Sequence, residues 1–131
     1  MRRKQRGSTL VEAALVITAF LTLVAGVIEF AMVGFAYNSI CFAAHRATRF
    51  AAVRGSGSGH SATTADVQGA ALANIAALDT NALTVTVTWI PDNHPGSSVQ
   101  VRVAYSLQPF LTTVSTKALT LQCTSKQMIV Q

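Results

Sequence analysis

The residues best placed for chemistry lie at the start of the chain, where the chain itself could be a substrate for cleavage. Gly7 is preceded by a cluster of basic residues, Arg2, Arg3, Lys4 and Arg6. Ser8 follows, and Glu12 is the fifth residue counted from Ser8. Because glycine has no side chain, the Gly7–Ser8 peptide bond is unhindered. We expect a peptidase to cut there, which would leave Ser8 as the new N-terminus.

Glu12 also has a local interpretation. The spacing of Thr9 and Glu12 fits a capping box at the start of a helix. An acidic residue in the first helical turn is favourable in any case. From the spacing alone, Glu12 is either a capping residue or part of a processing signal.

The element that must position this segment is a long apolar helix. Residues 13–28 carry no charge, and residues 10–28 are long enough to cross a membrane if Glu12 lies at one interface. Glu12 and Glu29 are 17 residues apart, which is roughly 25 Å of helix. The basic residues predict a cytoplasmic N-terminus. A secretory signal peptide is disfavoured, because its apolar region is shorter and ends at a small-residue cleavage site.

The helical pattern continues past the apolar run, so we expect one helix from about Thr9 to about Arg54. Small residues recur every fourth position on one of its faces, as Ala14, Thr18, Thr22 and Gly26. Such a face permits close helix contact, although alanine-rich helices also produce this spacing by chance.

The second half of the chain changes its period. A glycine–serine loop follows residue 54, and a short helix is expected from about Thr64 to Leu78. Apolar residues then alternate with polar ones around residues 83–89, 99–105 and 119–123, which predicts three antiparallel strands. The expected fold is α+β: a long N-terminal helix packed on a small three-stranded antiparallel sheet, with one short helix.

Charge and composition exclude several classes of protein. Without residues 1–7, six basic residues face five acidic ones, so no basic surface remains for nucleic acid. Half of the residues are apolar and the mean hydropathy is +0.41, which excludes a disordered chain. The histidines and aspartates have no metal-ligand spacing, and no phosphate-binding glycine loop occurs. We therefore expect no enzyme activity, no metal and no cofactor.

Three further charged residues have open interpretations. Glu29 is a carboxylate at the membrane interface, a partner for a base on another subunit, or a proton-transfer group. Arg46 and Arg49 share a helix face, either as a solvated or headgroup-facing pair or as a ligand clamp.

The two cysteines, Cys41 and Cys123, are expected on facing sides of the helix and the sheet. In an oxidising compartment they would form a disulfide. Two buried free thiols are the other interpretation.

The N-terminal pattern resembles the prepilin peptidase signal of type IV pilins and pseudopilins, which have glycine before the cut and glutamate five residues after it. The stretches Gly26–Phe30 and Ala44–Val53, with Val101–Tyr105 in the sheet region, are similar to the TadE-like family of tight-adherence (Flp) pilus systems. The resemblance implies cleavage after Gly7, and pairing of Glu12 with the N-terminal amine of a neighbouring subunit.

The resemblance also implies an organisation and a set of partners. Residues 1–7 would be a leader, 8–54 a helix with a transmembrane half at about 10–30, and 55–131 a head packed on the outer half of the helix. Expected partners are other pilin subunits, prepilin peptidase, the inner-membrane assembly platform and membrane lipid. The protein would span the bacterial inner membrane once, with a periplasmic head, or be extracellular in a pilus. The alternative is an uncleaved, signal-anchored envelope protein whose head binds a partner.

Overall fold

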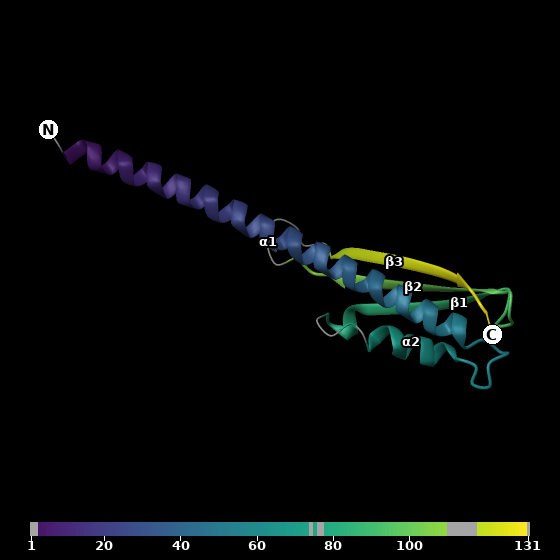
Figure 1. Cartoon of the computed structure of the whole chain (residues 1–131). Helices are drawn as coiled ribbons and strands as arrows, with labels where there is room; N and C mark the ends of the chain where they lie inside the picture. Colours follow the sequence, from purple (N-terminus) through teal and green to yellow (C-terminus); the bar gives the residue numbers. More distant parts are fainter. Residues whose placement is uncertain (1–2, 74, 76–77, 110–117, 131) are drawn as a thin grey trace. The chain divides into compact units, whose positions relative to one another are not determined.

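The computed structural model describes residues 3–73, 75, 78–109 and 118–130 (Figure 1). The chain forms two compact units, Met1–Met32 and Val33–Gln131. The elements follow in the order α1 (Arg3–Val53), α2 (Thr64–Leu72), a short 3-10 helix η1 (Thr80–Ala82), β1 (Leu83–Ile90), β2 (Ser98–Leu107) and β3 (Leu119–Met128). This is the expected α+β fold, with a long N-terminal helix, one short helix and three antiparallel strands.

The helix α1 begins earlier than the sequence predicts. We expected its start at about Thr9, after the glycine, but it begins at Arg3 and passes through Gly7. The residues before Gly7 are mainly arginine, lysine and glutamine, which are good helix formers. One glycine inside a helix costs only about 1 kcal/mol relative to alanine, so it does not interrupt the element.

The first unit consists of the N-terminal part of α1, and its large apolar side chains are exposed on all sides. Leu10, Leu15, Phe20 and Val27 are each more than half exposed. Among the described residues, one helix is long and apolar enough to cross a membrane, and it covers Gly7–Val53. A long helix whose apolar side chains are exposed fits a single-pass membrane anchor.

The second unit contains the sheet, in the order β1-β2-β3, with both strand pairs antiparallel. Its three strands contain the three predicted alternating segments, each extended by one to five residues. Val87 is opposite Val101 in β2, and Val103 is opposite Cys123 in β3. The alternation places apolar side chains on one face, where Val99, Val101 and Val103 are completely buried.

Both helices of the second unit cover this apolar face. One core cluster joins the α1 residues after Val33, the α2 residues Val67 and Ala71, and the inward residues of β2. The α1 contribution consists largely of alanines that are at most 4% exposed: Ala36, Ala43, Ala44, Ala47, Ala51 and Ala52. Because alanine is small, the helix backbone can lie close to the strands.

The helix α2 starts as expected and ends early. Thr63 caps it through a complete capping box with Asp66. We expected the helix to reach Leu78, but it ends at Leu72. The apolar stripe continues beyond that point because Ile75 is buried and Leu78 packs against the core, although neither residue is helical. Burial, and not helical structure, accounts for the last part of the stripe.

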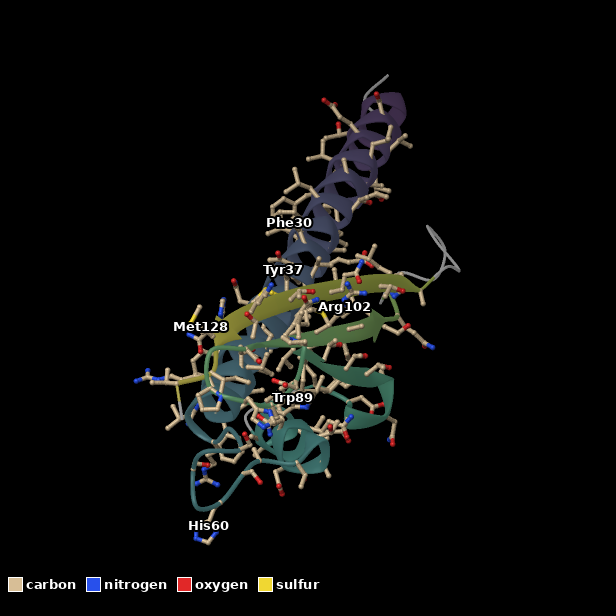
Figure 2. All side chains as sticks on the ribbon, turned by 90° about the vertical axis from the view of Figure 1, so that its right-hand side faces the viewer. Phe30, Tyr37, His60, Trp89, Arg102 and Met128 are labelled. Carbon is tan, nitrogen blue, oxygen red and sulfur yellow. A yellow bond between two sulfur atoms is a disulfide. The ribbon has the colours of Figure 1, made fainter. Side chains whose placement is uncertain are left out.

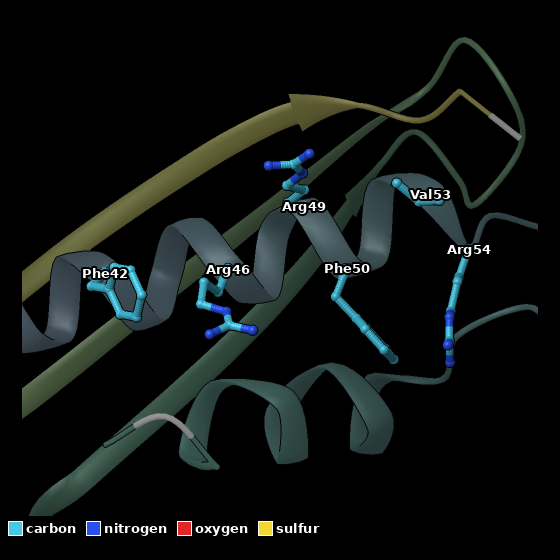
Figure 3. A pocket seen from close by; sticks show the side chains of 6 residues that line it. All are labelled: Phe42, Arg46, Arg49, Phe50, Val53 and Arg54. Carbon is cyan, nitrogen blue, oxygen red and sulfur yellow. The ribbon is translucent and has the colours of Figure 1, made fainter. Parts of the chain in front are cut away.

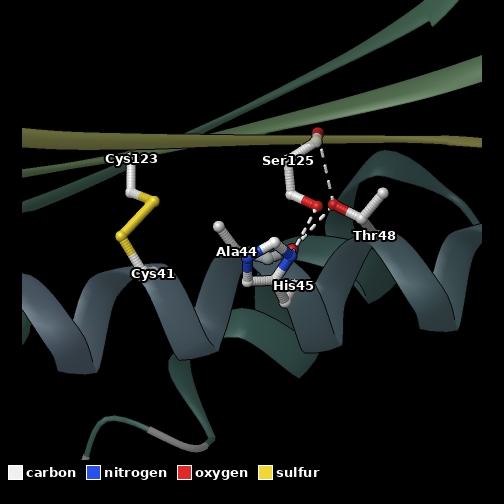
Figure 4. Close-up of a disulfide and its surroundings, with 6 residues drawn as sticks. All are labelled: Cys41, Ala44, His45, Thr48, Cys123 and Ser125. Atoms are coloured by element: carbon white, nitrogen blue, oxygen red, sulfur yellow. Dashed lines mark hydrogen bonds between the residues drawn. A yellow bond between two sulfur atoms is a disulfide. The ribbon is translucent and has the colours of Figure 1, made fainter.

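Side chains also connect α1 to β3 (Figure 4). Cys41 and Cys123 form a disulfide, with their Cα atoms 5.1 Å apart. Farther along α1, the buried hydroxyl of Thr48 donates to the Ala44 carbonyl at 2.7 Å and lies 3.4 Å from the Ser125 carbonyl. The Ser125 hydroxyl and His45 Nδ1 are hydrogen-bonded at 3.0 Å. The helix is thus linked to the edge strand β3 at three successive positions.

Candidate functional site

The segment predicted to be cut lies within the first turns of α1. Gly7 and Ser8 are both helical, and the side chains of Ser8 and Glu12 are exposed. Thr9 and Glu12 lie inside α1, which begins at Arg3, and not at the helix start where a capping box forms.

Gly7 has no packing role in the described structure. A Cβ atom built at Gly7 would have no neighbouring atom within 4 Å, and the same holds for Gly26 in the same helix. A side chain at either position would therefore meet open space. Any preference for glycine at position 7 must come from a molecule that binds the segment, and not from this fold.

The basic cluster before Gly7 is only partly described. Arg2 lies outside the described residues, and so do the side chains of Arg3, Lys4 and Arg6. Their predicted role as a cytoplasmic leader remains a prediction.

The threonine hydroxyls on the small-residue face of α1 donate hydrogen bonds to backbone carbonyls of the same helix. Thr18 Oγ1 donates to the Ala14 carbonyl, and Thr22 Oγ1 donates to the Thr18 carbonyl, both at 2.8 Å. In lipid an unpaired hydroxyl would be costly, so these intrahelical bonds make the threonines compatible with a membrane. The face can then present small, hydrogen-bonded side chains to another helix.

Glu29 is half-buried on α1 and has neither a hydrogen bond nor an ion pair within the described residues. Its neighbour Phe30 is 81% exposed and points away from the helix (Figure 2). The structure thus presents an unpaired carboxylate beside an exposed aromatic ring.

A second charged feature lies at the C-terminal end of α1, and we call it the arginine groove (Figure 3). It is an open hollow of about 560 Å³, lined by Phe42, Arg46, Arg49, Phe50, Val53 and Arg54. The Arg46 guanidinium lies 5.7 Å from the centre of the Phe42 ring, and that of Arg54 lies 4.4 Å from the Phe50 ring. Both distances permit cation–π attraction.

Sequence reasoning found Arg46 and Arg49 as a pair but missed the groove. The available signal was the spacing of four residues between Phe42 and Arg46 and between Phe50 and Arg54, which places each pair on one helix face. The link from His45 to Ser125 was also missed, because nothing in the sequence brings two residues 80 positions apart into contact.

The aspartates serve local structure. The pKa of Asp66 is held below 3.8, first by the backbone N–H of Thr63 and then by its hydroxyl. The pKa of Asp92 is lowered mainly by the hydroxyl of Ser97, which donates at 2.6 Å, and next by the backbone N–H of His94. The His94 imidazole also lies 3.2 Å from the Asp92 carboxylate. These contacts organise a helix start and the β1–β2 turn.

Metal-binding geometry does not occur within the described ranges. No three His, Cys, Asp or Glu side chains gather there in a way that could hold a metal ion.

Comparison with known proteins found a family similarity in the N-terminal segment. Residues 7–49 match the model of the TadE-like protein family, about one third of the chain. The match begins at the predicted cleavage glycine and contains Glu12, Glu29, Arg46 and Arg49. No curated protein and no solved structure matched the chain. Over residues 7–49, the chain is similar to the TadE-like protein family.

Proposed function

We propose that the protein is a TadE-like pilin or pseudopilin of a tight-adherence (Flp-class) type IV pilus. The observation that carries the proposal is the family match over residues 7–49, which starts at Gly7 and coincides with an exposed apolar helix. The family and the helix support a pilus-related, membrane-anchored protein with a structural role. Other pilus components are its natural partners.

The first proposed step is cleavage by a prepilin peptidase. Hydrolysis of the Gly7–Ser8 bond leaves a carboxylate on Gly7 and a free amine on Ser8, and it removes the basic leader. Because the bond lies within α1, the peptidase must first unwind this turn. Glycine is the residue that makes local unwinding easiest, apart from proline, since it gains the most backbone entropy.

The second proposed step is assembly through Glu12. A carboxylate in lipid is costly unless it is paired, and the new amine of Ser8 in a neighbouring subunit is a suitable cation. The small-residue face of α1 would permit close contact between helices in the assembly. Assembly into a pilus, or initiation of one, would follow from these contacts and from docking at the inner-membrane assembly platform.

The proposed orientation places residues 1–7 in the cytoplasm and the head, residues 55–131, in the periplasm. The basic cluster supports a cytoplasmic N-terminus. The disulfide between Cys41 and Cys123 supports an oxidising compartment for the head. In an assembled pilus the head would be extracellular.

The test is the mass of the mature protein extracted from membranes of cells that contain an active prepilin peptidase. We expect the chain to start at Ser8. Gly7→Leu should leave the chain starting at Met1, whereas Gly26→Leu should still be cut. The two variants are comparable because an added side chain at either position has no atom to clash with in the fold. A wild-type chain that starts at Met1 would instead support the uncleaved, signal-anchored envelope protein.

A variant of Glu12 separates cutting from assembly. We expect Glu12→Ala to be cut at Ser8 but to be at least ten-fold depleted from sheared pili, because the partner of the N-terminal amine is lost. Normal incorporation of this variant would contradict the proposed pairing.

A further inference from the structure

The arginine groove holds three exposed guanidinium groups that lack a bound carboxylate. Within the described residues, none of Arg46, Arg49 and Arg54 takes part in a salt bridge. Arg46 and Arg54 extend from α1 on the side of α2, and Arg49 extends on the opposite side (Figure 3). Phe42 and Val53 are each more than half exposed, so the groove combines cations with accessible apolar surface. It is suited to an acidic group that is flanked by apolar side chains.

The chain's own acidic residues indicate what could occupy the groove. There are five, and the three aspartates are engaged locally. Asp66 caps α2, Asp79 accepts a hydrogen bond from the Asn81 backbone N–H, and Asp92 organises the β1–β2 turn. Arg54 faces Asp66 closely enough to contribute to its lowered pKa, which leaves Arg46 and Arg49 as the cations without a nearby acid.

The two glutamates remain, and both are without a partner in the described part of the chain. Glu12 is assigned to the N-terminal amine in the proposed function. Glu29 is left, and it lies between Ile28 and Phe30, which are 55% and 81% exposed. This combination of one carboxylate with apolar neighbours complements the groove in both charge and hydrophobicity.

We propose that the arginine groove of one copy binds the Glu29–Phe30 segment of a second copy. Arg46, which extends from α1 on the side of α2, would hold the carboxylate, since a guanidinium group binds a carboxylate in a geometry of two parallel hydrogen bonds. Phe30 would pack against the apolar wall of the groove. The inference rests on the proposed function, in which the α1 helices of several copies pack in parallel.

The contact requires the two copies to be offset along their helices. Glu29 precedes Arg46 by 17 residues, so one copy must be shifted by about that length of helix relative to the other. Such an offset is a property of helical filaments and is absent from a side-by-side symmetric dimer. Glu29 would thereby gain a cation when it leaves the membrane interface, where water and headgroups solvate it.

The first experiment is photo-crosslinking of the full chain in membranes of cells that contain the pilus assembly machinery. A benzophenone amino acid replaces Phe30, and the same probe at Phe20, which is 63% exposed, is the control. We expect the position 30 probe to form a covalent dimer whose adduct maps to residues 42–54, and the position 20 probe to give no adduct there. An adduct with lipid only, an adduct elsewhere on the protein, or no dimer would overturn the inference.

A charge-reversal series then tests the ion pair. Glu29→Arg and, separately, Arg46→Glu should each reduce the position 30 adduct at least five-fold, because like charges then face each other. The variant that carries both reversals should restore at least half of it. Arg102→Glu, a reversal at an exposed arginine of β2, should leave the adduct unchanged. No loss in the single reversals, or no rescue in the variant with both reversals, would overturn the proposed pairing.

The mass of the protein in the same samples shows where the chain starts, and it therefore tests cleavage separately from the contact between copies. Chains that start at Ser8 but give no adduct at residues 42–54 would refute this inference alone. Chains that start at Met1 and still give the adduct would refute cleavage while retaining the contact between copies.

Discussion

At the scale of single residues, aspartates of the head form hydrogen bonds at the start of α2 and in the β1–β2 turn. The Thr63 backbone N–H donates to Asp66 Oδ2 at 2.9 Å, and the Thr63 hydroxyl donates to the same oxygen at 2.7 Å. The Asp66 N–H donates back to the Thr63 hydroxyl at 3.3 Å. These bonds favour the charged carboxylate, which is why its pKa is lower in the folded protein.

This capping box predicts a pH-dependent contribution to stability. Because the folded form of Asp66 binds a proton less readily than the unfolded form, its contribution is present above the unfolded pKa of about 3.8. It is lost as the pH falls through the lower, folded pKa. The variant Asp66→Asn should therefore melt at a lower temperature than the wild type at pH 7, and the difference should shrink towards pH 3.

The measurement is thermal unfolding of the full chain in detergent micelles, followed by the fluorescence of Trp89, the single tryptophan, which lies in β1. Asp92 also has a lowered pKa, but it is present in both proteins and cancels in the comparison. A difference in melting temperature that stays constant between pH 7 and pH 3 would show that Asp66 acts through its shape alone.

At the scale of elements, the decisive contact is that of α1 with the sheet. Ala43, Ala44, Ala47 and Ala51 are completely buried at this contact. The disulfide and the Thr48 and His45 contacts with Ser125 require the helix to lie close to β3. Small residues thus set the separation that the specific contacts need.

Enlarging one of these alanines should destabilise the head. We expect Ala47→Leu to lower the free energy of unfolding by about 1–3 kcal/mol, because the larger side chain must push the helix away from the sheet. Asn38→Leu is the matched control on the exposed side of α1 and should change it by less than about 0.5 kcal/mol. Denaturant unfolding followed by Trp89 fluorescence measures both; equal effects would mean that the contact tolerates expansion.

At the scale of the whole molecule, the two units meet different physical requirements. The unit from Val33 onward buries its own apolar side chains in one core. The unit before it leaves its apolar side chains exposed, so it needs lipid or other helices around it. The disulfide lies wholly within the later unit and links residues 82 positions apart.

The disulfide should supply a large part of the stability of the head. Replacing both cysteines with serine should lower the free energy of unfolding by about 2–5 kcal/mol, chiefly because the unfolded chain regains the entropy of a long loop. Wild-type protein unfolded in the presence of a reductant should behave like the double variant. If the Trp89 transition is the same with and without the bond, the core alone stabilises the head.

Local patterns were sufficient to predict most of the fold. The apolar run predicted the anchor helix, the alternation of apolar and polar residues predicted all three strands, and Thr63 with Asp66 predicted the start of α2. These features can be predicted because each depends on residues that are close in sequence. The N-terminal processing pattern, from Gly7 to Glu12, was equally visible in the sequence, and it stays a prediction.

Tertiary structure decided the remainder. The sequence left open whether Cys41 and Cys123 are bridged, because pairing depends on the distance between two elements. It also overestimated the length of α2, because Ile75 and Leu78 keep the helical spacing while packing outside the helix. The absence of an acid near Arg46 and Arg49 likewise depends on where other segments lie. Sequence alone determined which segments are helix, strand or membrane-compatible, since those preferences are local; only the folded chain determined which side chains remain unpaired, since that depends on every neighbour.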